Sequence, residues 1–162
     1  MTSKEINIIG GGCAALSLAR LNNLLPKYKF NIFMKDQHQT VKDHYWGFWK
    51  FIENQEAFDN SCHTWNNWAI ITHESKNILN SKQHPYCVIK RHKWLNFCLS
   101  KLKYKKVSVF NKKILEINNE LFDDDYKING EYVFDSRPPK IPSNILLQHF
   151  EGYVINSKDE IF

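Results

Sequence analysis

Residues 6–20 read INIIGGGCAALSLAR, and this stretch decides the fold. A short apolar run reaches three glycines and continues as an alanine- and leucine-rich segment with helical spacing. That order predicts a strand, a tight turn and a helix. Gly10, Gly12 and Ala15 take the three positions of the G-x-G-x-x-G/A pattern that binds dinucleotides. The stretch therefore predicts a nucleotide-binding βαβ unit, against the simpler alternative of a connecting turn.

The small residues of this pattern have separate physical roles. Gly10 permits the sharp turn out of the strand, and Gly12 lets a pyrophosphate approach the backbone N–H groups at the start of the helix. Ala15 lets the helix pack closely on the sheet. The residues expected to bind the cofactor here are Gly10, Gly11, Gly12, Cys13, Ala14 and Ala15.

Composition sets the class of protein. A hydrophobic content of 43% over 162 residues predicts one or two folded units rather than a disordered chain. The net charge of +5 suits phosphates or an anionic membrane. The excess lysines are spread thinly, so we expect them to be solvated and expect no nucleic-acid partner.

Targeting and metal signals are weak. Residues 1–5 are polar, and no apolar run approaches the roughly 20 residues that span a bilayer, so we expect a cytoplasmic protein. The four cysteines form no C-x-x-C pair, which predicts reduced thiols and no metal site.

The segment after the glycine turn completes the predicted βαβ unit. The helix should end close to Leu25, because Pro26 cannot continue it, and residues 30–34 should form the second strand. An acidic side chain about 20 residues beyond the glycines binds the adenosine ribose in such folds, and Asp36 is the candidate. If the register is one residue shorter, Lys35 takes this position and suits a phosphorylated ribose instead.

Aromatic residues are dense in residues 43–51, DHYWGFWKF. Such a run either forms a buried plug between two layers or lines a pocket for a large apolar or planar ligand. The composition does not separate these two alternatives.

The remaining pattern predicts further strands and one clear helix. We expect a strand at residues 69–71, a polar turn at 77–84, and strands at 107–117 and 126–134 flanking an exposed acidic hairpin tip at 123–125. Residues 91–102 have helical spacing, and the side chains predicted to share the core-facing side are Trp94, Leu95, Cys98, Leu99 and Leu102.

Two polar groups follow the apolar segments near the end of the chain. Arg137, in the run VFDSRPP, either meets a phosphate or carboxylate or forms a structural salt bridge. His149, in the run LLQHFEGY, either titrates near neutral pH or is a structural histidine.

Four segments in series resemble the lycopene cyclase family of flavoproteins: residues 8–19, 43–49, 134–138 and 147–153. The first is common to many flavoproteins, whereas the other three in this order are more specific. The chain departs from the family pattern at Ala15, at Tyr45 where a threonine is expected, and at Tyr153 where a tryptophan is expected.

The resemblance implies an α/β fold with an N-terminal Rossmann-type FAD-binding βαβ unit and inserted substrate-domain strands, as in aromatic hydroxylase-like flavoproteins. The implied units are residues 1–50, with the βαβ unit and the aromatic loop, and residues 51–162, with substrate-side strands and a return to the nucleotide-binding layer. The implied activity is a non-redox, flavin-dependent closure of the ends of lycopene into β-rings, in carotenoid biosynthesis. The implied cofactors are FAD in its reduced form and NAD(P)H as its reductant. A membrane-dissolved carotenoid also implies peripheral contact with a membrane.

The resemblance also suggests roles for individual residues. It puts Arg137 with the cofactor and puts on the substrate side Trp46, Phe48, Trp49, His149 and Gly152, since a polyene cation needs aromatic, water-poor surroundings. Family members are longer, and their acidic segment would lie beyond Phe162, so we assign no catalytic residue and expect an N-terminal portion of an enzyme. The alternatives are another FAD-dependent oxidoreductase, of the monooxygenase or geranylgeranyl reductase type, and an inactive nucleotide-binding remnant.

Overall fold

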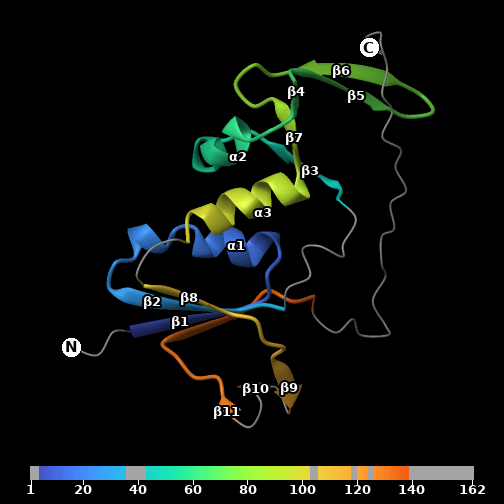
Figure 1. The fold of residues 1–162 in the computed structure, drawn as a ribbon. Coiled ribbons are helices and arrows are strands. Elements are labelled where there is room, and N and C mark those ends of the chain that lie inside the picture. Colours follow the sequence, from blue (N-terminus) through green and yellow to red (C-terminus); the bar gives the residue numbers. More distant parts are fainter. Residues whose placement is uncertain (1–3, 36–42, 103–105, 118–119, 124–125, 139–162) are drawn as a thin grey trace.

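A four-stranded parallel sheet, ordered β12-β1-β2-β8, lies at the centre of the fold (Figure 1). The computed structural model describes residues 4–35, 43–102, 106–117, 120–123 and 126–138. The strands of this sheet are β1 (Lys4–Ile9), β2 (Tyr28–Phe33), β8 (Val107–Phe110) and β12 (Tyr132–Asp135). The two central strands are buried along most of their length, which fits their nearly continuous apolar sequence.

Two helices cover one face of this sheet (Figure 1). Helix α1 (Cys13–Ala19) and helix α3 (Arg91–Ser100) bury a shared stripe of side chains against β1 and β2. The buried residues that make up this main core include Ile6, Ile8, Leu16, Phe30, Ile32, Trp94 and Leu95. The helix predicted for residues 91–102 is confirmed as α3. Of its predicted core-facing side chains, Trp94, Leu95, Cys98 and Leu102 are buried and Leu99 is half-buried.

The opposite face of the sheet is covered by a small antiparallel sheet of three strands, β9 (Leu115–Ile117), β10 (Glu120–Asp123) and β11 (Tyr126–Lys127). Ile9, Phe33 and Ile114 form a second buried cluster between these layers. Alternate residues of β1 and β2 thus pack on opposite faces, as the strand pleat requires.

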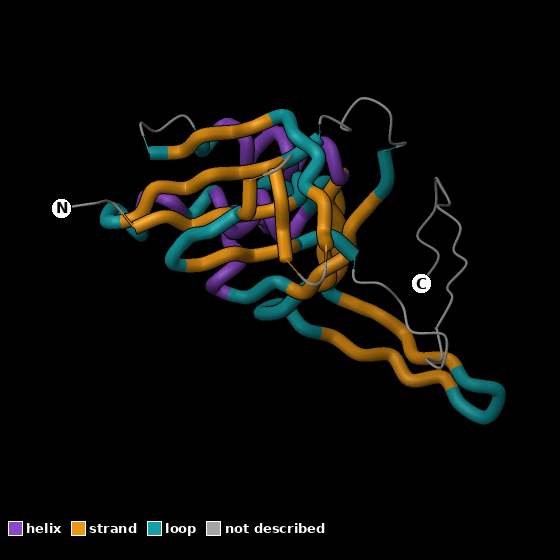
Figure 2. The backbone as a smooth tube through the Cα atoms, turned by 90° about the horizontal axis from the view of Figure 1, so that it is seen from below, coloured by secondary structure: helices purple, strands orange, loops and turns teal. Residues whose placement is uncertain are grey.

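A second group of elements lies beyond the helices. Strands β3 (Tyr45–Trp49), β7 (Tyr86–Lys90) and β4 (His63–Trp65) form an antiparallel sheet in the order β3-β7-β4. A short helix α2 (Gln55–Asp59) follows the 3₁₀ turn η2 (Ile52–Asn54). Strands β5 (Asn67–Ile71) and β6 (Lys76–Asn80) pair only with each other in the described sheets and project from the rest of the described fold (Figure 2).

A buried pair of amides fixes the position of β12 beside β1. Asn31 Nδ2 donates to Asn7 Oδ1 at 2.9 Å, and Asn7 Nδ2 donates to the carbonyl of Asn129 at 2.8 Å. A β-carbon at Gly130 would lie 2.5 Å from Asn7 Nδ2, so the turn before β12 approaches β1 this closely because residue 130 is a glycine.

Four predictions of secondary structure are wrong in detail. Helix α1 ends at Ala19 rather than near Leu25, because the Asn22 side chain donates to the Ala19 carbonyl and a 3₁₀ turn η1 (Asn22–Leu24) follows. The first half of the polar turn predicted at 77–84 belongs to strand β6, whose backbone pairs with β5 despite its polar sequence. The strands predicted at 107–117 and 126–134 each divide into two, since β8 and β12 join the parallel sheet while β9 and β11 join the small sheet.

The strands predicted at 30–34 and 69–71 are confirmed as β2 and β5. The parallel sheet draws β8 and β12 from the second predicted unit, and the division at residue 50 stays a prediction. Across the described residues, no helix combines the length and apolar character needed to cross a membrane.

Candidate functional site

The glycine turn joins the end of β1 to the start of α1. Gly10 has a φ of 107°, which only glycine adopts without strain, and its N–H donates to the Phe33 carbonyl at 2.8 Å. A β-carbon at Gly10 would overlap Ser136 Oγ. The first glycine is therefore required by both the backbone conformation and the close approach of a distant segment.

Ser136 comes from the end of β12 and holds it against the end of β1. Its backbone N–H and its hydroxyl both donate to the Ile9 carbonyl, each at 2.9 Å. This double hydrogen bond places the segment after β12 directly beside the glycine turn.

The other two glycines differ in what surrounds them. A β-carbon at Gly11 would lie 3.1 Å from the Met34 β-carbon, so Gly11 faces the end of β2. A β-carbon at Gly12 would meet no protein atom within 4 Å, and the residue is exposed. Open space thus lies over Gly12, where the first backbone N–H groups of α1 have no acceptor within the helix.

A cavity of about 480 Å³ opens at this turn. The cavity lies at the carboxyl ends of β1, β2 and β12. The connections from β1 lead to β2 on one side while β12 pairs on the other side, so the topological switch point of the sheet lies between β1 and β12. Open α/β sheets bind ligands at this point. The lining residues are Ile9, Gly10, Gly11, Gly12, Phe33, Met34, Lys35, Lys112, Lys113, Ile114, Ser136, Arg137 and Pro138.

The cavity carries basic side chains, and two of them, Lys112 with Asp123 and Arg137 with Asp135, are held in ion pairs. The Arg137 guanidinium meets the Asp135 carboxylate at 2.6 Å (Nη2 to Oδ2) and 2.9 Å (Nε to Oδ1), and Nη1 donates to the Ile114 carbonyl at 2.5 Å. The hydrogen bond from Arg137 holds the pKa of Asp135 below its ordinary value, and Asp135 raises the pKa of Arg137. Arg137 therefore does form a structural salt bridge, while its side chain also lines the cavity.

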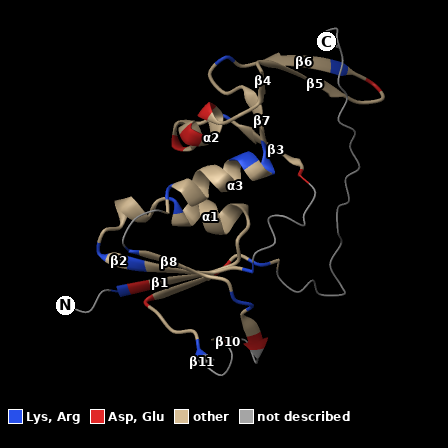
Figure 3. Cartoon of the chain, in the orientation of Figure 1, with Lys and Arg blue, Asp and Glu red and all other residues tan. Residues whose placement is uncertain are grey.

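Arg91 was not predicted as a site residue from the sequence. It is the first residue of α3, where basic residues gather (Figure 3), and it is 8% exposed. Its Nη1 has no hydrogen-bond partner among the described residues. A buried guanidinium nitrogen that lacks an acceptor is costly, so this position suits an anion. An arginine directly after an apolar strand and at the start of a helix was the available sequence signal.

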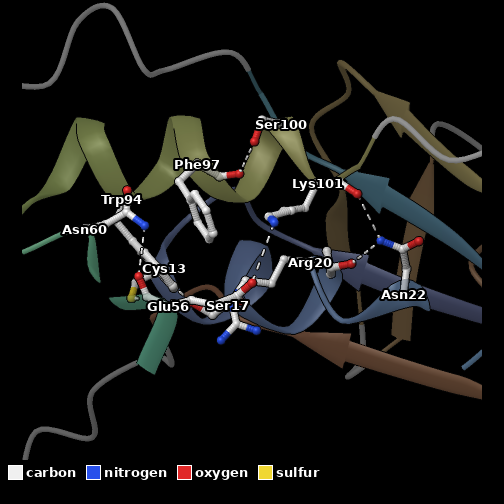
Figure 4. A network of polar contacts seen from close by, with 11 residues as sticks. Cys13, Ser17, Arg20, Asn22, Glu56, Asn60, Trp94, Phe97, Ser100 and Lys101 are labelled. Carbon is white, nitrogen blue, oxygen red and sulfur yellow. Dashed lines mark hydrogen bonds and ion pairs between the residues drawn. The ribbon is translucent and has the colours of Figure 1, made fainter. Parts of the chain in front are cut away.

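Contacts between α1 and α3 set the relative direction of the two helices (Figure 4). Trp94 Nε1 donates to Ser17 Oγ at 2.9 Å, and Arg20 lies over the Trp94 ring at 5.3 Å. Farther along, Asn22 Nδ2 donates to the Lys101 carbonyl at 3.4 Å. The two packed helices are therefore parallel, so the start of α3 lies at the same end as the start of α1.

The aromatic residues of β3 divide between two surroundings. Trp46 and Phe48 pack against the main core, as the plug alternative predicts. Trp49 points to the other side, where its ring meets Trp68 at 4.6 Å and Tyr86 at 5.0 Å. The cavity at the glycine turn is lined by other residues, so the structure does not bring the three aromatic side chains together with the glycines.

The remaining predicted site residues are placed as follows. Cys13 and Ala14 are exposed in the first turn of α1, and Ala15 is buried against the sheet. Asp36, His149 and Gly152 lie outside the described residues, and their roles stay predictions. No cluster of three or more histidine, cysteine or acidic side chains suited to a metal ion occurs in the described part of the chain.

Solved structures with the same fold are numerous. A point mutant of MHPCO aligns with a TM-score of 0.57 and 15% sequence identity, over 82% of this chain and 39% of that one. PqsL of P. aeruginosa, in complex with 2-aminobenzoylacetate, aligns with a TM-score of 0.57 and 10% identity, over 82% of this chain and 41% of that one. CtdE, in complex with FAD and a substrate, gives a TM-score of 0.56 and 14% identity, over 82% of this chain and 37% of that one.

These similarities confirm the predicted fold class, an α/β fold of the aromatic hydroxylase type. The chain spans about two fifths of the length of these structures. A search of curated protein sequences finds no match. A family model does match, over residues 5–162, and its description is "Lycopene cyclase protein".

Proposed function

The chain belongs to the lycopene cyclase family, and from this premise we propose that it binds FAD and serves the ring closure of lycopene end groups. The observation that carries the proposal is the cavity at the glycine turn, with Gly12 open to it. Family membership suggests the substrate, and the cavity supports the cofactor.

The residues of the turn fit a dinucleotide. The open space over Gly12 suits a pyrophosphate, which would accept hydrogen bonds from the N–H groups at the start of α1. The lysines of the cavity, Lys35 and Lys113, add positive charge on its walls. Arg91, at the same end of the helix pair, would meet an anionic group of the cofactor, and Asp36 would bind the adenosine ribose.

The proposed reaction adds a proton to the end of a polyene and removes a proton after ring closure, so the product is an isomer of the substrate. A bound reduced flavin would supply negative charge near the transient cation, and NAD(P)H would keep it reduced. The resemblance puts on the substrate side Trp46, Phe48, Trp49, His149 and Gly152. Trp46 and Phe48 share one face of β3, where they would exclude water from an apolar substrate, whereas Trp49 lies on the other face. We assign no residue of this chain as the proton donor.

The substrate class also bears on location. Lycopene is a hydrocarbon that dissolves in membranes, so we propose a cytoplasmic chain that contacts the membrane surface. The excess of lysines over acidic residues suits an anionic bilayer.

Two measurements test the proposal. FAD titrated into the purified chain should quench flavin fluorescence saturably, and Gly12→Val should weaken that binding at least about tenfold. Expression of the full chain in lycopene-accumulating cells tests the ring closure, and formation of β-carotene would support it. A flavin-containing protein with unchanged lycopene would contradict the ring closure and favour a nucleotide-binding remnant. Oxidation or reduction of lycopene would favour another FAD-dependent oxidoreductase.

A further inference from the structure

The end of β2 places Lys35 on the wall of the cavity at the glycine turn. The Gly10 N–H donates to the Phe33 carbonyl at 2.8 Å, so the last residue of β2 lies alongside the turn. Met34 lies beside Gly11, and Lys35 then lines the cavity. Lys35 therefore stands at the end of the second strand, at one of the two positions considered for the ribose-binding side chain.

The chemistry of this position depends on the charge of its side chain. In a nucleotide-binding sheet, an acidic side chain near the end of the second strand accepts hydrogen bonds from the ribose hydroxyls of adenosine. A lysine ammonium has three donors and no acceptor, so it cannot accept these hydrogen bonds. It binds phosphate instead, as a point charge. Lys35 therefore suits an adenosine ribose that carries a phosphate.

A second lysine reaches the cavity from the neighbouring strand. Strand β8 pairs with β2 in parallel, and the Met34 N–H donates to the Phe110 carbonyl at 2.9 Å. The segment after β8 leads into the same cavity, which its Lys113 lines together with Lys35. In the strand order β12-β1-β2-β8, both lysines follow strands on the β8 side of β1, whereas Arg137 follows β12 on the other side.

The charges of the cavity suit a dianionic group on this side. The described lining of the cavity contains four basic side chains and no acidic one. Two of them, Lys112 and Arg137, are balanced by the carboxylates described above. Lys35 and Lys113 supply the other two positive charges. A phosphate monoester carries a charge of roughly −2 at pH 7, which this pair of ammonium groups would match.

We propose that Lys35 and Lys113 form a subsite for a phosphate monoester on the adenosine ribose of a nucleotide bound at the glycine turn. The inference rests on the proposed function in one respect, the placement of a nucleotide pyrophosphate at Gly12. FAD has free ribose hydroxyls, for which Asp36 is the proposed partner. The subsite extends the class of ligand from FAD to adenine nucleotides whose ribose is phosphorylated at the 2′ or the 3′ position.

Two pairs of nucleotides test the subsite, because the members of each pair differ only in a ribose phosphate. They are ADP-ribose with 2′-phospho-ADP-ribose, and dephospho-coenzyme A with coenzyme A. Calorimetric titration of the purified full chain without FAD should give at least about tenfold tighter binding for the phosphorylated member of one pair. The pair with the larger ratio identifies the position of the phosphate. The tighter nucleotide should also displace FAD, because both occupy the glycine turn.

Variants of the two lysines connect the preference to the subsite. Lys35→Gln and Lys113→Gln should each lower the preference at least about threefold, and Lys35→Glu should abolish it. The control Lys27→Gln removes the same charge at an exposed position that precedes β2, at the opposite end of the strand, and should keep the preference. Urea unfolding of the same samples separates loss of the subsite from loss of the fold.

Equal affinities within both pairs, in a chain that binds FAD, would overturn the subsite and leave the proposed function intact. Absence of binding by FAD and by all four nucleotides would overturn both. A preference that persists in Lys35→Gln and in Lys113→Gln would overturn the assignment of the subsite to these two lysines.

Discussion

Ser136 Oγ occupies the position into which a side chain at residue 10 would project. Gly10 and Ser136 are 126 residues apart in the chain. The same hydroxyl donates to the Ile9 carbonyl at 2.9 Å. The glycine turn and the end of β12 are thus in direct contact, so a substitution in one should change the stability contributed by the other.

Gly10→Ala should destabilise the fold by about 2 kcal/mol, because alanine meets both an unfavourable φ and the Ser136 hydroxyl. The double variant Gly10→Ala/Ser136→Ala removes the overlap but keeps the strained φ, so it should recover part of the loss. Urea unfolding of the four proteins in this cycle measures the coupling. Strictly additive effects would contradict the close approach of the two residues.

Gly12→Val should leave the free energy of unfolding within about 0.5 kcal/mol, since no protein atom lies near the added side chain. The same change should weaken FAD binding at least about tenfold, because valine fills the space proposed for the pyrophosphate. Fluorescence titration and urea unfolding measure the two effects. Asn96→Val, at an exposed position of α3, is the control and should alter neither. Unchanged FAD affinity in Gly12→Val would place the cofactor elsewhere.

Arg91→Met should raise the stability of the cofactor-free chain by up to about 1 kcal/mol, because it replaces a buried charge, whose Nη1 atom has no acceptor among the described residues, by an apolar side chain of similar length. FAD affinity should fall about tenfold, since the proposed anionic partner loses its cation. Thermal unfolding with and without FAD measures both. The control Lys93→Met changes an exposed residue two positions away and should alter neither the stability nor the FAD affinity. A large loss of stability in Arg91→Met would show that the guanidinium serves the fold instead.

Asp135 should make stability depend on pH in the acid range. Its pKa in the folded chain lies below the ordinary 3.8, chiefly through the hydrogen bond from Arg137. Folding therefore favours the ionised carboxylate: the stabilisation is fully present above pH 3.8 and is lost as the pH falls through the lower folded value. Because the pair is about one-third exposed, we expect a contribution below about 1 kcal/mol.

Asp135→Asn should remove this dependence. The difference in unfolding free energy between the variant and the unchanged chain should be constant near neutral pH and shrink below about pH 4. Denaturant unfolding at a series of pH values measures this difference. A difference that grows on acidification would contradict the assigned direction.

Local sequence predicted the elements whose signals lie within one segment. The apolar run, the glycines and the small residues of residues 6–20 predicted β1, the turn and α1, and the spacing of residues 91–102 predicted α3 with its buried face. The end of α1 was misplaced, because the Asn22 side chain competes with the helix for the Ala19 carbonyl. Strand β6 was not predicted because its own sequence is polar, and its extended conformation is held by pairing with β5.

The sequence by itself determined the glycine pattern, the βαβ start and the resemblance that the family match confirms. Only the tertiary structure decided that Ser136 packs against Gly10, that the buried Arg91 has an Nη1 atom with no acceptor among the described residues, and that Trp49 points away from Trp46 and Phe48. The physical reason is one of distance along the chain. A turn is specified by the conformational freedom of its own residues, whereas a site at a sheet edge is specified by which strands pair, and that depends on burial summed over the whole core.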